Sequence, residues 1–216
     1  THMKHPENTD SKNLITSPLA YLRNNFGRPG DTYSYKTKCL SQVGKYTCND
    51  FGGHNNCTLT ATCNISLYYN ALGYTHIPSN PFEIYSFVKK HATSLGYSYT
   101  KRKGLIVTKN DNLLRRLWHK SFRYPNIRCK SNYMWSDKTA LKLINNGQPF
   151  LFSLASGVYF NHTVAVYGYR IYTNNRTGHQ YTFLMLADGW SNATRYLAWS
   201  GTGESYVGCM SRISSV

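Results

Sequence analysis

Apolar residues at helical spacing form the clearest pattern in the first two thirds of the chain. After Cys57, the apolar positions that recur every three or four residues are Ala61, Ile65, Tyr68, Tyr69 and Leu72. This period predicts a helix that starts at Cys57. Asn56 is a good N-cap for this helix, and Gly73 is a natural stop because glycine readily adopts the backbone conformation that ends helices.

Three further helices are predicted between this first helix and Pro149. One spans residues 82–95, since Pro81 precedes it and Gly96 follows it. Shorter helices are expected over residues 111–120 and 136–146, the second of which ends before Gly147.

The character of the chain changes after Pro149. Short runs rich in β-branched and aromatic residues are separated by Asn, Gly and Thr, which favour turns. These runs cover residues 150–154, 163–172, 181–187, 194–199 and 206–213. Helices followed by antiparallel strands predict the α+β class.

The segment before the first helix is polar and rich in glycine and proline. We expect an irregular lead-in over residues 4–40. Thr1, His2 and Met3 read as a remnant of cloning and take no part in the predicted fold. Residues 41–216 are then expected to form one domain, a length that suffices to bury a sizeable core.

Charge is the most unusual feature of the composition. The chain carries 25 Lys and Arg against 9 Asp and Glu, a formal net charge of +16, which favours anionic partners such as an anionic cell-wall surface. The basic residues are scattered, and no zinc-finger, homeodomain or RNA-binding spacing accompanies them, so no specific nucleic-acid site is expected. A hydrophobic content of 41% excludes a disordered chain, and no apolar run approaches the roughly 20 residues of a membrane span.

Six cysteines add a second constraint. None belongs to a C-x-x-C pair, so neither a zinc site nor any other metal or cofactor is expected. Cys39 with Cys48 is the first local pair we would expect to form a disulfide. Cys63 lies six residues after Cys57, on a different face of the predicted helix, and is expected to be a buried structural thiol.

Three residues together indicate nucleophilic chemistry. Cys57 in the first turn of a helix is favoured as a thiolate by the unpaired backbone N–H groups and the helix dipole. His162 heads an apolar strand, and Asp188 follows the next one, so two adjacent antiparallel strands would bring them to the same sheet edge. The carboxylate of Asp188 is then expected to accept a hydrogen bond from the imidazole, with the Trp190 indole shielding that bond from water.

These residues resemble a known family. Asn56-Cys57 at a helix start, Asn161-His162-Thr163-Val164-Ala165-Val166-Tyr167-Gly168-Tyr169 and Ala187-Asp188-Gly189-Trp190 resemble the Cys, His and Asn/Asp boxes of papain-like cysteine peptidases. The likeness extends over roughly residues 50–200 and is greatest to the bacteriocin-leader-peptidase-like branch of secreted Gram-positive bacterial proteins. It implies a helical half with Cys57 packed on a β-sheet half with His162 and Asp188. It also implies a secreted or cell-surface bacterial peptidase that acts on a protein or peptide through an acyl-enzyme.

One position departs from the family pattern. Papain-like peptidases usually place a glutamine about six residues before the cysteine, where it donates a hydrogen bond to the oxyanion, and here that position is Phe51. Asn49, or Gln42 from a differently shaped loop, is the expected substitute. Losing one such donor typically costs on the order of 100-fold or more in rate.

Two other functions fit the same residues. A papain-like cell-wall amidase would use the same nucleophile, and the basic charge suits an anionic wall, although the Asp-Cys-Ser-Gly signature common in those enzymes is absent. A papain-like binding module with little or no activity is the alternative that the missing glutamine motivates.

Overall fold

The computed structural model describes residues 14–215 and has the predicted α+β class. The helices are α1 (Pro18–Asn25), α2 (Cys57–Ala71), α3 (Pro81–Ser94), α4 (Asn110–Arg116) and α5 (Asp137–Asn145). Shorter turns are the 3-10 helices η2 (Asn49–Phe51) and η3 (Val107–Lys109) and the π-helix η4 (Leu117–Ser121). The strands are β1 (Tyr33–Cys39), β2 (Arg128–Asn132), β3 (Phe150–Leu154), β4 (His162–Asn174), β5 (Gln180–Ala187), β6 (Arg195–Ala198) and β7 (Gly208–Ser215).

All the strands belong to one antiparallel sheet. Its order is β2-β7-β3-β4-β5-β6, and β1 pairs with β4 outside that path. The long strand β4 organises the sheet because β3 pairs with its first half and β1 with its second half, while β5 runs along its other edge. The residue at the very start of β4 is His162, which pairs with Leu154 at the end of β3.

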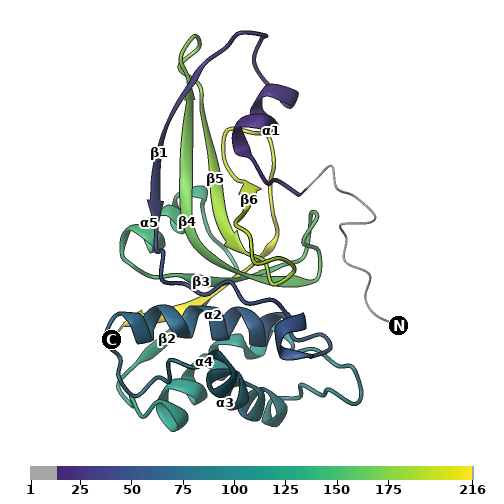
Figure 1. Cartoon of the computed structure of the whole chain (residues 1–216), viewed down its shortest axis with the longest axis vertical. Helices are drawn as coiled ribbons and strands as arrows, with labels where there is room; N and C mark the ends of the chain where they lie inside the picture. Colours follow the sequence, from purple (N-terminus) through teal and green to yellow (C-terminus); the bar gives the residue numbers. More distant parts are fainter. Residues whose placement is uncertain (1–13, 216) are drawn as a thin grey trace.

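Helices α2, α3 and α4 form a layer against the sheet, whereas α1 packs on β5 and α5 on β1 and β4. Figure 1 shows β1, β4, β5 and β6 in the upper part of the molecule, with α2 beneath them and α3 farther away, while α4 lies below α2 and packs on β2 and β7. Helix α2 packs on β3 and β4 on one side and on α3 on the other. Its N-terminus therefore lies at the boundary between the helical layer and the sheet.

Helix α2 is buried almost all round, polar residues included. Two of its hydroxyls are satisfied by the helix itself, since Thr62 donates to the Thr58 carbonyl (2.7 Å) and Ser66 to the Thr62 carbonyl (2.8 Å). The Asn64 side chain both accepts from the Tyr46 N–H (2.9 Å) and donates to the Tyr46 carbonyl (3.0 Å). These bonds pair the polar groups of Thr62, Asn64 and Ser66 within the core.

Sequence patterning located most of these elements to within a few residues. The helices expected at 57, 82–95, 111–120 and 136–146 are confirmed as α2, α3, α4 with η4, and α5. Two of them begin with side-chain caps: Asn80 accepts from the Phe82 N–H (2.9 Å), and Ser136 forms a capping box with Thr139. The five predicted strands correspond to β3 to β7.

The irregular lead-in over residues 4–40 is wrong for its described part. Residues 14–40 contain α1 and β1, and Leu22 of α1 is completely buried, while Tyr21 and Phe26 pack on Phe183 and Tyr181 of β5. The sequence of β1 does alternate Tyr, Tyr, Thr and Cys with Ser and Lys, but its side chains are mostly exposed, and the surrounding polar residues, Gly and Pro favoured an irregular segment. Strand β2 was missed because its five residues are short of apolar side chains and none of them is fully buried. Residues 1–3, and residues 4–13 of the lead-in, lie outside the described residues.

The expected Cys39–Cys48 disulfide is also wrong. All six cysteines lie within residues 14–215, and each is a free thiol. Cys39 is exposed at the end of β1. The backbone N–H of Cys48, by contrast, donates to the carbonyl of Gly189, in the turn after β5. Cys63 is buried in α2, as expected for a structural thiol. Within the described part of the chain, no helix is both long and apolar enough to cross a membrane.

Candidate active site

The thiol of Cys57 lies at the first residue of α2 and is partly exposed. In the first turn of a helix, backbone N–H groups have no partner within the helix and point toward incoming negative charge. No acidic side chain stands in this turn to compete for them. The position therefore favours a thiolate over a thiol.

A buried chain of hydrogen bonds fixes the start of β4 against the start of α2. Thr58 Oγ1 donates to Thr163 Oγ1 (3.0 Å), and Thr163 Oγ1 is bonded in turn to Ser153 Oγ (2.8 Å). Asn110 at the start of α4 donates to Ser153 Oγ (2.9 Å), so α2, α4, β3 and β4 all join this network. Because Thr58 follows Cys57 and Thr163 follows His162, the Thr58–Thr163 bond holds the two site residues beside each other.

The imidazole of His162 is oriented by the main chain. Its Nε2 atom lies 2.5 Å from the backbone carbonyl oxygen of Asp188, so Nε2 carries the proton of that bond. The other ring nitrogen, Nδ1, is left for the thiol. The strand register brings these groups together, since Ala165 of β4 pairs with Ala187, the last residue of β5 before Asp188.

The predicted bond between the Asp188 carboxylate and His162 is wrong in its detail. The carboxylate instead accepts from the backbone N–H groups of Trp190 (2.9 Å) and Ser191 (3.0 Å) and from the Tyr159 hydroxyl (2.9 Å). Asp188 is 1% exposed, and these three bonds hold the turn after β5. The side chain thereby positions its own carbonyl, and that carbonyl positions the histidine.

Aromatic rings enclose the imidazole. The Trp190 ring stacks on His162 with centroids 4.3 Å apart and an interplanar angle of 23°. Tyr159 lies 5.9 Å from His162 and 4.9 Å from Trp190, so the three rings form one cluster. His162 is only 8% exposed. The stacked Trp190 ring covers the imidazole that forms the hydrogen bond to the Asp188 carbonyl.

The thiol and the imidazole change each other's ionisation. Burial alone would raise the pKa of Cys57, but the hydrogen bond and charge of His162 and the backbone N–H of Thr163 lower that pKa to about 7. Burial opposes the charged form of His162, yet the hydrogen bond and charge of Cys57 raise the His162 pKa, with the Asp188 carbonyl adding to them. These shifts favour a thiolate–imidazolium pair near neutral pH.

The two side chains predicted to donate to the oxyanion, Gln42 and Asn49, lie at different distances along the chain from the contacts of the site. Gln42 is exposed and precedes a loop that pairs with α2 through Gly44 and Asn64 (2.9 Å). Asn64 is seven residues from Cys57, about 10 Å along a helix axis, so Gln42 is not brought to the thiol. Asn49 is exposed in η2, next to Cys48, whose N–H donates to the Gly189 carbonyl (2.8 Å) at the site. Of the two residues, Asn49 is the one whose neighbour in the chain bonds to the site.

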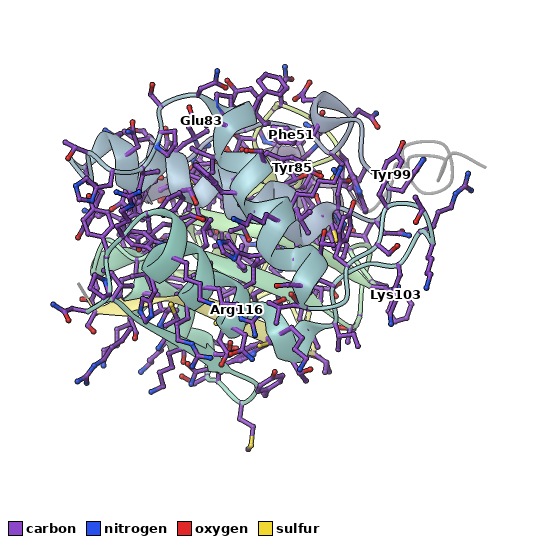
Figure 2. The ribbon with its side chains drawn as sticks, turned by 90° about the horizontal axis from the view of Figure 1, so that it is seen from below. Phe51, Glu83, Tyr85, Tyr99, Lys103 and Arg116 are labelled. Carbon is purple, nitrogen blue, oxygen red and sulfur yellow. The ribbon has the colours of Figure 1, made fainter. Side chains whose placement is uncertain are left out.

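Phe51 has a structural role at the position where the family pattern has glutamine. Its ring stacks on Tyr85 of α3 with centroids 4.2 Å apart and an interplanar angle of 6°, and Phe82 packs on its edge. Figure 2 shows Phe51 and Tyr85 side by side at the α3 end of the helical layer. This stack holds the loop that leads into Cys57.

Two residues next to the thiol have roles that sequence patterning missed. Asn56 occupies the N-cap position, but its side chain makes no capping bond and donates to the Cys48 carbonyl (3.2 Å) and the Tyr85 hydroxyl (3.0 Å). Asn56 therefore ties the loop, α2 and α3 together. Burial and the neighbouring Cys57 raise the pKa of Cys48 to about 12, so this second thiol stays protonated. Within residues 14–215 no group of His, Cys, Asp and Glu is arranged to hold a metal ion.

Comparison with known proteins adds no relative: no model of a protein family matches the chain, and neither does any curated protein. The chemistry of the site therefore has to be inferred from its own geometry.

We expect Cys57 to react with iodoacetamide at pH 6. With a pKa of about 7, on the order of one thiol in ten is ionised there, against about one in a thousand for a pKa of 9. His162→Ala removes the hydrogen bond and the positive charge, so the rate at pH 6 should fall roughly 30- to 100-fold. Peptide mass spectrometry after timed labelling between pH 5 and 9 measures this, with exposed Cys39 as an unactivated control in the same sample. Labelling of Cys57 that rises only above pH 8 in both proteins would contradict the pair.

The role of the Asp188 turn can be separated from the charge of Asp188. Asp188→Asn keeps the backbone carbonyl and an oxygen that can accept from Trp190 and Ser191, so labelling at pH 6 should stay within about threefold of the unmodified protein. Asp188→Ala removes all three bonds and should lower the rate by about tenfold or more, because the carbonyl is no longer held against His162. The same labelling assay measures both variants. If Asp188→Asn is as slow as Asp188→Ala, the negative charge and not the carbonyl position is what matters.

Proposed function

We propose that this protein is a papain-like cysteine peptidase that hydrolyses peptide bonds through an acyl-enzyme on Cys57. The observation that carries the proposal is the Cys57–His162 pair, formed where the N-terminus of α2 meets the first residue of β4. A thiol with a pKa of about 7, beside an oriented and shielded imidazole, combines the nucleophile and the acid–base group that acyl transfer needs.

The proposed reaction has two stages. The Cys57 thiolate attacks the carbonyl carbon, and the tetrahedral intermediate collapses with cleavage of the C–N bond as the His162 imidazolium gives its Nδ1 proton to the leaving amine. Water then attacks the thioester, His162 takes up a proton of that water, and cleavage of the C–S bond releases the carboxylic acid and restores the Cys57 thiolate beside the protonated His162.

The oxyanion that forms in each stage needs hydrogen-bond donors. The free N–H groups in the first turn of α2 supply one such donor at Cys57 itself. Asn49 is the side chain that we propose as the second, because it follows Cys48, whose N–H donates to the Gly189 carbonyl beside the site, and because its amide is the same kind of donor as that of glutamine.

The proposed peptidase requires the Cys57 thiol and no other cysteine. Cys57→Ala should lower the rate of peptide cleavage by about a thousandfold or more, since it removes the nucleophile while the small side chain leaves the helix start intact. The measurement is mass spectrometry of new peptide termini in a complex peptide mixture incubated with the unmodified protein or the variant.

Cys63→Ala is the matched control. Cys63 is a fully buried thiol on the same helix, and its replacement should leave the cleavage rate within about threefold of the unmodified protein. If new termini appear equally with Cys57→Ala, the peptidase proposal fails. If rapid Cys57 labelling is accompanied by cleavage of cell-wall muropeptides and of no protein-derived peptide, the same nucleophile belongs to an amidase.

A further inference from the structure

Positive charge that is dispersed along the sequence gathers in the helical layer. Between residues 81 and 135 the chain has twelve Lys and Arg but only two acidic residues, Glu83 and Asp111. The basic residues occur as separate short groups on α3, α4, η4, β2 and the connections between them. Folding brings α3 against α4 and η4, so groups that are 26 to 30 positions apart become neighbours.

Three of these cations line one hollow. Lys90 of α3, Arg116 of α4 and Lys120 of η4 surround a hollow of about 370 Å³, together with His91, Ser94 and Ser121. Figure 2 shows Arg116 on the face where α3 and α4 lie together, well away from the loop that carries Phe51. The hollow is thus separate from the Cys57 site.

Two of the basic side chains at the hollow are held by hydrogen bonds, and the hollow carries no counter-charge. Arg116 donates to Ser94 Oγ (3.0 Å), which holds the guanidinium at the rim, and His91 is bonded to Ser121 Oγ (2.7 Å). No carboxylate lines the hollow. Among residues 14–215 the one ion pair joins Arg176 and Asp31, in a different part of the fold.

The three positive charges at the hollow favour a ligand with more than one negative charge. A carboxylate brings a single negative charge and two oxygens, whereas a phosphate monoester brings about −1.5 to −2 and three oxygens at neutral pH. Three cations fit the second ligand, because a doubly charged group neutralises more of the repulsion between Lys90, Arg116 and Lys120. A π-helical turn such as η4 is also a frequent feature of functional sites.

A second basic hollow lies on the other flank of the same helix. It is lined by Arg115, His119 and Arg128 among others, and Arg115 and Arg116 are adjacent residues that point about 100° apart around α4. A ligand with repeated phosphates could therefore engage both hollows across α4 and η4, while a single phosphate would occupy one.

We propose that the hollow formed by Lys90, Arg116 and Lys120 is a phosphate-binding site. The test is isothermal titration of the whole protein with inorganic phosphate and with polyphosphate, in about 150 mM salt so that weak surface attraction is screened. Saturable binding of polyphosphate alone identifies a phosphate-bearing polymer as the partner. Equal binding of both per phosphate group identifies a free phosphate or small phosphate ester. Either result supports the site.

Two matched variants locate the binding. Lys90→Ala with Lys120→Ala should weaken binding by about tenfold or more, since two of the three cations are lost. Lys138→Ala with Lys142→Ala removes the same charge from exposed positions on α5 and should change affinity by less than about threefold. A bound dianion should also raise the pKa of His91, which NMR titration of its ring protons measures.

Three outcomes would overturn the site. One is the absence of saturable binding to either phosphate probe. Another is an equal loss of affinity in the α3/η4 and α5 variants, which would show that total charge is responsible. The third is equally tight binding of polyglutamate of matched charge, because a site built for phosphate should prefer phosphate to carboxylate. Failure of the peptidase proposal has no bearing on these measurements.

Discussion

The hydrogen bond between Thr58 and Thr163 is the contact on which the arrangement of the site depends. Cys57 and His162 are 105 positions apart and belong to different layers of the fold. Each is followed by a threonine, and the two hydroxyls meet in the core, where an unpaired hydroxyl would cost on the order of 1–3 kcal/mol. The bond ties α2 to β4 at this point, so the network that buries these threonines also holds the thiol and the imidazole near each other.

The imidazole of His162 is held by a backbone carbonyl and not by a hydrogen bond to a carboxylate. The carboxylate of Asp188 is used to close the turn after β5, and the carbonyl that results from that turn accepts the Nε2 proton of His162. Trp190 belongs to the same turn and covers the ring. One short segment therefore fixes the tautomer of His162, its orientation and its exclusion from water, three requirements for an effective acid–base group.

Sequence patterning was sufficient where burial follows a simple period. Helix α3 and strands β3, β4 and β5 bury one face or both, and their bounds were predicted closely. Strand β1 alternates larger and polar residues but buries no face, and its pairing with β4 became visible only in the fold. Residue types and order indicated Cys57 and His162. The atom of Asp188 that contacts the histidine was not predictable, because it depends on which backbone N–H groups capture the carboxylate.

The most direct test of this account is an ultraviolet titration of the Cys57 thiolate in the unmodified protein and in Thr163→Val, each corrected with its Cys57→Ser counterpart. Valine matches threonine in shape and lacks only the hydroxyl, so the core stays filled while the bond to Thr58 is lost. The account predicts a thiolate midpoint near 7 in the unmodified protein and an upward shift of about one unit or more in the variant. An unmodified protein that titrates near 9, or a variant with an unchanged midpoint, would contradict it.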